Sequence, residues 1–83
     1  MNVRDKVREY IIENFLFGDA EPLADDDMSL LDEGVIDSVG VMELVAFLES
    51  DFGISVGDEE LVPDNLDSVA NLVAFVGRKQ AAA

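Results

Sequence analysis

The sequence predicts an all-α fold, a small four-helix bundle with three longer helices and one short helix. Three segments repeat hydrophobic residues at the three- and four-residue spacing of an amphipathic helix, and we see no alternating pattern long enough for a sheet. At 83 residues the chain has room for one domain only. We expect this domain over residues 1–80, followed by a disordered tail at 81–83, where the sequence ends in alanines.

The first helix is predicted from Val3 to Phe15 or Phe17, because apolar residues recur there at every fourth position. We expect Gly18 to end it. A long acidic loop should follow as far as Ser29. The next two residues, Leu30 and Leu31, are expected to pack back onto the domain.

The acidic loop does not match a calcium-binding loop. An EF-hand that started at Asp25 would have Leu30 where glycine is needed and Ile36 where the bidentate glutamate belongs. We therefore predict no specific metal site, and nonspecific cation binding by residues 25–27 stays open.

The second helix is predicted to begin after Asp37 as N-cap, to reach Phe52 and to stop at Gly53. On a helical wheel one stripe faces the core: Val41, Leu44, Val45, Leu48 and Phe52. The opposite side carries Val39, Met42 and Ala46 next to Glu43 and Ser50, with Glu49 toward the flank. These side chains are either a strip on which a partner docks or ordinary exposed hydrophobic residues.

Ser38 follows the predicted N-cap, and its hydroxyl has no role in the helix. The N-terminus of a helix carries partial positive charge and unpaired N–H groups, so a phosphate ester at Ser38 would be stabilised. Gly34 allows a sharp turn before the cap, and Gly40 removes side-chain bulk from the first turn. The alternative is that Asp37 and Ser38 only cap a helix.

The rest of the sequence predicts an extended connector, one helical turn and a last helix. Ile54 and Val56 should anchor an extended connector, and residues 58–62 should form one helical turn before Pro63. The last helix is expected to be capped near Asp67 and to end near Gly77. Its buried face is predicted to contain Val69, Leu72, Val73 and Val76.

Composition excludes several classes of function. The chain has no cysteine and no histidine, so disulfides, thiolate metal sites and the usual partners of a nucleophilic serine are absent, and we expect no enzymatic activity. The net charge is −14, which disfavours binding to nucleic acids and anionic membranes and favours partners with basic patches. No segment resembles a signal peptide or a membrane span, so a cytoplasmic protein is expected. We also expect a monomer.

All five basic residues lie near the two ends of the sequence: Arg4, Lys6, Arg8, Arg78 and Lys79. The segment between them is free of cations, which is a stronger segregation than solubility alone requires. A solvated acidic surface remains the simpler alternative.

The stretch LLDEGVIDSVGVMELVAFLESDFGISVGDEEL resembles the region around the prosthetic-group serine of acyl carrier proteins. That family consists of small acidic four-helix proteins, in which a hydrophobic-Asp-Ser-hydrophobic motif opens the second helix. The resemblance extends over nearly the whole chain. It implies that Ser38 carries 4'-phosphopantetheine, installed from coenzyme A by a phosphopantetheinyl transferase, and that the thiol of this arm holds an acyl group as a thioester.

The resemblance also implies a docking surface for partner enzymes. Carried over by position, it consists of Asp37, Val39, Met42, Glu43, Ala46 and Glu49, and Val56 borders it. The implied partners are an acyl- or aminoacyl-activating ligase, a synthase or a transferase with a basic docking patch. Two residues separate Gly34 from Asp37, where housekeeping fatty-acid carriers tend to have one, which looks more like D-alanyl carriers and carriers of specialised pathways.

A second class of function stays open beside the carrier reading. An unmodified acidic helical domain could bind a basic partner through the second helix. The two hypotheses differ in whether Ser38 becomes covalently modified.

Overall fold

The computed structural model describes residues 2–82 and is helical throughout its regular structure. Its elements are α1 (Val3–Phe15), the 3₁₀ turn η1 (Glu21–Leu23), α2 (Ser38–Phe52), the 3₁₀ turn η2 (Asp58–Glu60), α3 (Pro63–Leu66) and α4 (Val69–Ala82). Within residues 2–82 there is no strand, so the predicted all-α bundle is confirmed.

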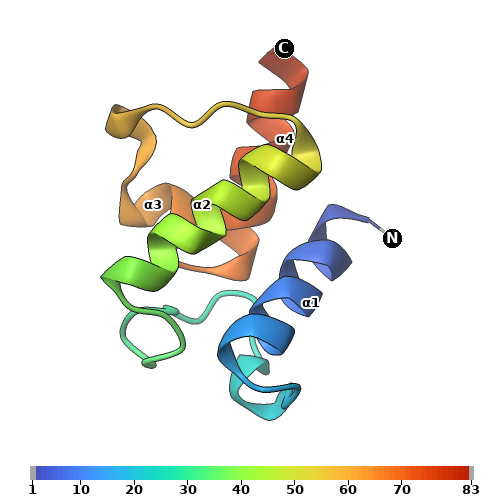
Figure 1. Cartoon of the computed structure of the whole chain (residues 1–83), viewed down its shortest axis with the longest axis vertical. Coiled ribbons are helices and arrows are strands. Elements are labelled where there is room, and N and C mark those ends of the chain that lie inside the picture. The colour runs from blue at the N-terminus through green and yellow to red at the C-terminus, as the bar shows by residue number, and fades with distance from the viewer. Residues whose placement is uncertain (1, 83) are drawn as a thin grey trace.

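Helix α4 lies at the centre of the bundle and contacts α1, α2 and α3 (Figure 1). Helix α2 crosses diagonally in front of α4, and α1 lies beside them at the lower right of the view (Figure 1). The long loop between α1 and α2 closes one end of the molecule, and the connector from α2 to α3 passes over the other (Figure 1).

Helix α1 ends at Phe15, the earlier of its two predicted ends. The amides of Leu16 and Gly18 both donate to the carbonyl of Ile12, at 3.2 and 2.9 Å. Phe17, with φ of 55°, and Gly18, with φ of 87°, are both in the left-handed region. As a result the Phe17 side chain points into solvent and is 96% exposed.

The hydrophobic core contains the predicted stripes and several loop residues. Leu44, Val45 and Leu48 of α2 are buried, while Val41 and Phe52 at the ends of the stripe are partly buried. The loop after α1 contributes Leu23 and Leu30, both with no exposed surface. The burial of Leu30 was predicted, and that of Leu23 was not. The prediction for Leu31 was wrong, because its side chain stays 41% exposed.

The C-terminal third departs from the predicted boundaries. Residues 58–60 form the expected turn, but the short helix α3 starts only at Pro63, where a missing N–H costs nothing. Helix α4 begins at Val69, and its N-cap is Ser68, whose Oγ accepts the N–H of Asn71 at 3.0 Å. The predicted cap, Asp67, is used elsewhere.

Helix α4 also runs past its predicted end at Gly77 and continues through Ala82. One interior glycine costs a helix only about 1 kcal/mol, and the residues after it are good helix formers. Ala81 and Ala82 are therefore helical where a disordered tail was expected, and residue 83 lies outside the described residues. The predicted buried residues Val69, Leu72 and Val76 of α4 are buried, but Val73 is only partly buried. Phe75, which was not predicted, is buried as well.

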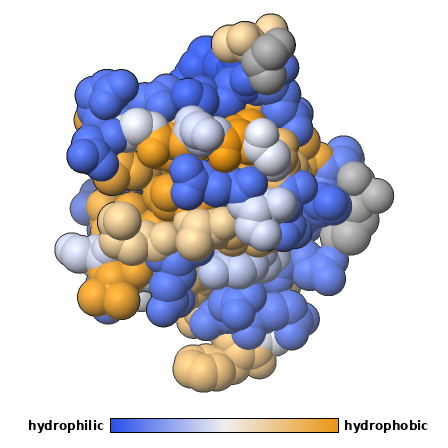
Figure 2. All heavy atoms as spheres, turned by 45° about the horizontal axis from the view of Figure 1, so that its top comes forward, coloured by the Kyte–Doolittle hydropathy of each residue, from blue (hydrophilic) through white to orange (hydrophobic). Residues whose placement is uncertain are grey.

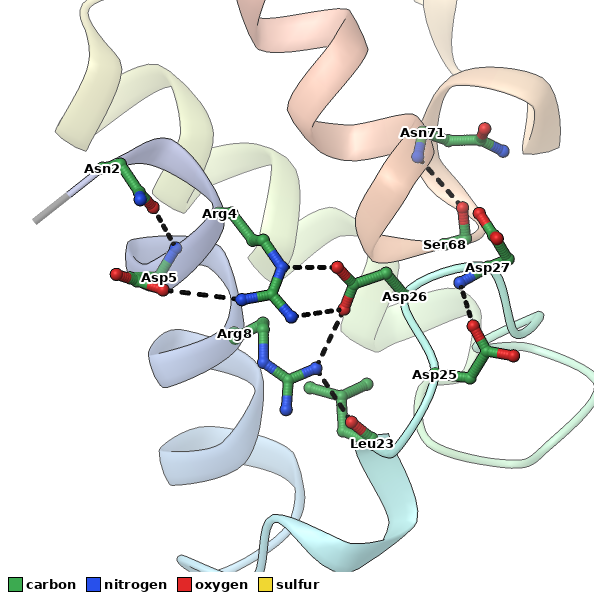
Figure 3. A network of polar contacts seen from close by, with 10 residues as sticks. All are labelled: Asn2, Arg4, Asp5, Arg8, Leu23, Asp25, Asp26, Asp27, Ser68 and Asn71. Atoms are coloured by element: carbon green, nitrogen blue, oxygen red, sulfur yellow. Dashed lines mark hydrogen bonds and ion pairs between the residues drawn. The ribbon is translucent and has the colours of Figure 1, made fainter.

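Charged contacts hold the acidic loop against α1 (Figure 3). Arg4 and Arg8 both bind the carboxylate of Asp26, and Arg8 also donates to the carbonyl of Leu23 at 2.8 Å. The hydrogen bond from Arg4 lowers the pKa of Asp26 below its ordinary value. The neighbouring Asp25 accepts the amide of Asp27, so the three aspartates do not converge on one point.

Within residues 2–82 no group of acidic side chains is arranged to hold a metal ion. No helix in the same range is both long and apolar enough to cross a bilayer.

Candidate functional site

Asp37 caps α2 as the sequence predicts. Its backbone is extended, and its Oδ1 accepts the amide of Gly40 at 2.8 Å. Helix α2 then begins at Ser38, which is exposed to solvent. The cap therefore uses the carboxylate of Asp37 and leaves the Ser38 hydroxyl available for chemistry at the surface.

The loop that leads to Ser38 turns at Gly34 and then anchors in the core. Gly34 has φ of 73°, a left-handed conformation that favours glycine. The next two residues, Val35 and Ile36, are 8% and 5% exposed, and both of their amides donate to the carbonyl of Leu30. The two-residue spacing between Gly34 and Asp37 thus places two core anchors immediately before the site.

Asp67 ties this loop to the start of α4. Its carboxylate accepts the hydroxyl of Ser29 and the amide of Leu31, the latter at 2.9 Å, while its carbonyl accepts the amide of Leu30 at 2.7 Å. Ser29 in turn accepts the amide of Asp32. Asp67 is therefore a clamp on the loop, and this role replaces its predicted role as a helix cap.

Phe15 of α1 packs closely against Gly40, where the absence of a side chain leaves room in the first turn of α2. A Cβ atom on Gly40 would lie 3.0 Å from Cε1 of the Phe15 ring, so a larger residue would push the ring away. Phe15 itself packs edge-on against Tyr10, with ring centroids 5.9 Å apart. The N-terminus of α2 is consequently seated on the C-terminal end of α1.

Two surface grooves lie near Ser38 and share Leu31 as a wall. The larger has a volume of about 420 Å³ and is lined by Phe15, Leu31, Gly34, Val35, Ile36, Asp37 and Ser38. The smaller, of about 150 Å³, is lined by Leu31, Val41, Leu61, Val62, Pro63, Leu66 and Asp67. Leu44 and Leu48, in contrast, are fully buried and line neither groove.

The opposite side of α2 is exposed as the helical wheel predicts. Val39 and Met42 are 69% and 56% exposed, and the remaining predicted members on this helix are exposed as well: Asp37, Glu43, Ala46 and Glu49. On the face seen in Figure 2, hydrophobic surface crosses the middle of the molecule between hydrophilic areas above and below it. Val56 is partly buried, and its amide donates to Oε2 of Glu49 at 2.9 Å.

The basic residues balance charges away from this surface. In residues 2–82, Arg4 and Arg8 pair with acidic residues of α1 and the loop, and Lys79 pairs with Glu60. None of these ion pairs involves a carboxylate on the exposed side of α2. Glu43 and Glu49 therefore make no ion pair within residues 2–82.

Phe15, Leu31 and Asp67 belong to the surroundings of Ser38 but were not found from the sequence. Phe15 looked like one more member of a core stripe, and Asp67 looked like an ordinary cap. The sequence indicated only that Gly40 removes side-chain bulk from the first turn of α2.

The sequence is also similar to a known protein family and to known proteins. Residues 5–76 match the family described as Phosphopantetheine attachment site. The chain is 32% identical to Probable acyl carrier protein PigG of Serratia sp. (strain ATCC 39006), over 95% of this chain and 90% of that protein. It is 34% identical to the D-alanyl carrier protein of Streptococcus pyogenes serotype M5 (strain Manfredo), over 96% of this chain and 98% of that protein.

Proposed function

The chain belongs to the phosphopantetheine attachment family of carrier proteins, and on this premise we propose that Ser38 is the residue that takes the 4'-phosphopantetheine. The protein acts as a carrier through such an arm, and its relatives are carriers rather than catalysts. The alternative of an unmodified interaction module is not favoured. The observation that carries the assignment is an exposed serine at a capped helix N-terminus, beside a groove.

The residues around Ser38 fit a group attached through a phosphodiester. The first turn of α2 offers N–H groups and partial positive charge to a phosphate on the hydroxyl, and the Asp37 side chain already occupies the Gly40 amide. The groove next to Ser38 has a volume within the usual range of small-molecule sites. The bound arm supplies the thiol that this cysteine-free chain lacks.

Attachment is a phosphoryl transfer from coenzyme A in the active site of a phosphopantetheinyl transferase. The Ser38 oxygen forms a bond to the phosphorus that bears the pantetheine, and the pyrophosphate bond to the nucleotide breaks. Adenosine 3',5'-bisphosphate leaves, and the hydroxyl proton passes to a base on the transferase. This chain contributes the accessible hydroxyl and the helix start that presents it.

We further propose that partner enzymes dock on the exposed side of α2. This docking surface consists of Asp37, Val39, Met42, Glu43, Ala46, Glu49 and, at its border, Val56. The exposure of Val39 and Met42 and the absence of ion pairs on this side of α2 within residues 2–82 support it. A partner with a basic rim around an apolar centre matches this surface in charge and polarity.

The cargo we propose is an acyl or aminoacyl group of a specialised pathway rather than a housekeeping fatty acid. The two anchoring residues between Gly34 and Asp37 support this proposal. So do relatives that are named for D-alanyl and acyl cargo. The partners that load and unload the arm would be an activating ligase, a synthase or a transferase.

The test is to incubate the purified protein with coenzyme A and a broad-specificity phosphopantetheinyl transferase. Intact mass should show one adduct, and peptide mapping should assign it to Ser38. Ser38→Ala should take up none while keeping its helical spectrum, whereas Ser55→Ala, at an exposed serine on the connector, should be modified normally. An adduct on another residue, or none when a control carrier is modified, would refute the assignment.

A further inference from the structure

The larger groove near Ser38 suits a flexible group that is attached to this serine. Its polar end is formed by Asp37 and Ser38, and its apolar floor by Val35 and Ile36, which are almost completely buried. The side walls are Phe15 from α1 and Leu31 from the loop. The smaller groove does not border Ser38 at all.

Phe15 is held in place as a wall by the helix start itself. Because Gly40 has no Cβ, the ring comes to the distance at which a methyl group there would touch it, 3.0 Å. Gly40 is buried by this contact, although it lies only two residues after the exposed serine. The missing side chain thus shapes the groove next to the attachment point.

Leu31 is held in place by its backbone while its side chain remains on the surface. Its amide donates to the Asp67 carboxylate at 2.9 Å, and the preceding amide donates to the Asp67 carbonyl. Leu30 is completely buried, whereas Leu31 is 41% exposed. A fixed backbone with an exposed leucine makes Leu31 a ridge between the two grooves.

We propose that the pantetheine arm on Ser38 lies along the larger groove, with its branched dimethyl carbon against Phe15 and Leu31, and that Leu31 separates it from the smaller groove. This inference rests on the proposed attachment at Ser38. The dimethyl carbon follows closely after the phosphate along the arm, so it is the first apolar part that reaches these walls. The tether keeps the arm at a high local concentration, of millimolar order for short flexible linkers, so weak contacts suffice to populate the bound position.

The acidic turn beside the groove suits this occupant. Asp32, Glu33 and Asp37 are all exposed around the turn that leads to Ser38. Carboxylates there would repel an anionic ligand that diffuses in from solution. A neutral arm whose phosphate is already linked to Ser38 avoids this repulsion along most of its length.

The experiment compares the apo and holo forms of the full chain by NMR, after mass mapping has assigned the adduct to Ser38. We expect nuclear Overhauser contacts from the two methyl groups of the arm to the Phe15 ring and the Leu31 methyls. Contacts to Val62 and Leu61 instead, or no contacts to any side chain beyond the serine's neighbours, would overturn the groove proposal alone. Failure of Ser38 to take the group would overturn both proposals.

Substitutions at two positions whose side chains are almost equally exposed, Leu31 and Val62, make the test more specific. Leu31→Ala removes the shared ridge, and Val62→Ala changes only the smaller groove, where Val62 is 40% exposed. In holo Leu31→Ala the contacts to Phe15 should weaken and contacts to Val62 should appear, whereas holo Val62→Ala should match the unaltered protein. Phe15→Leu provides a second variant, and apo spectra of each verify the fold. Identical arm contacts in Leu31→Ala and the unaltered protein would refute the role of Leu31.

Discussion

In the described part of the chain, acidic residues in the loops at the two ends of α2 form ion pairs, whereas those on the exposed side of that helix do not. In the loops, cations from the terminal helices meet acids: Arg4 and Arg8 bind Asp26, and Lys79 binds Glu60. On the exposed side of α2, Glu43 and Glu49 have no cation as a partner among residues 2–82. The cations near the two ends of the sequence are therefore used in contacts within the fold, and the acidic residues on the exposed side of α2 make no ion pair among residues 2–82.

This comparison explains where the few basic residues are used. Basic side chains from α1 and α4 bind the two segments that flank α2 and fix their positions. These contacts form a framework that holds α2. The arginines of this framework also find neutral acceptors, since Arg78 donates to the side chain of Asn65 at 2.8 Å. Under the proposed docking on α2, a basic partner would neutralise Glu43 and Glu49.

The strongest way to break the framework is at Asp67. Replacing it in Asp67→Ala leaves the Ser29 hydroxyl and the Leu31 amide without their acceptor. We expect the free energy of unfolding to fall by about 1–3 kcal/mol. Urea denaturation measures this, and Asp64→Ala, at an exposed position on α3, should change it little. Equal stability of the two variants would contradict the clamp.

The charge of the exposed α2 surface is tested by Glu43→Lys. We expect the kcat/KM of a phosphopantetheinyl transferase for this variant to fall about tenfold at low salt, because basic partners are then repelled. Glu21→Lys makes the same change of charge in η1 and should have little effect. The difference between the two variants should shrink as salt rises. A salt-independent difference would argue against an electrostatic origin.

Two helical glycines differ in how much space surrounds them: Gly40 lies against Phe15, and a Cβ atom added at Gly77 would have no neighbour within 4 Å. Gly77→Ala should raise the free energy of unfolding by about 1 kcal/mol, because no atom lies near the added methyl group and alanine favours helix. Gly40→Ala should instead lower it by about 1 kcal/mol, because the methyl group would press on Phe15. Chemical denaturation of both variants checks the contrast. A similar gain at both positions would mean that the Phe15 ring moves at no cost.

The smallest effect is expected from the ion pair of the acidic loop at low pH. The bond from Arg4 lowers the pKa of Asp26 in the folded protein, so its contribution to stability is complete above the ordinary carboxyl pKa and is lost as pH falls through the lowered value. Thermal unfolding of Asp26→Asn should therefore differ from the unaltered protein at pH 6, and the difference should shrink as pH falls below the ordinary carboxyl pKa. Asp27→Asn, which leaves the arginine contacts intact, serves as control. A difference that does not change with pH would point to packing rather than charge.

Much of the site follows from local rules that a sequence displays directly. Helix α2 begins after Asp37 and stops at Gly53, which has φ of 65°, because capping and left-handed glycine act over three or four residues. The exposed and buried sides of α2 follow from helical periodicity in the same way. The acyl-carrier resemblance depends on these same residues, which is why the family could be recognised early.

The tertiary structure alone decided what surrounds Ser38. Asp67 and Leu31 are far apart in the sequence yet hydrogen-bonded, and Phe15 meets Gly40 across two helices. Leu31 was expected to be buried but is exposed, and Leu23 is buried although no burial was predicted for it. An irregular segment has no periodicity from which its buried side can be predicted. Local sequence thus determined where the serine stands and what caps it. The walls of its groove depend on how distant segments pack, which no local pattern encodes.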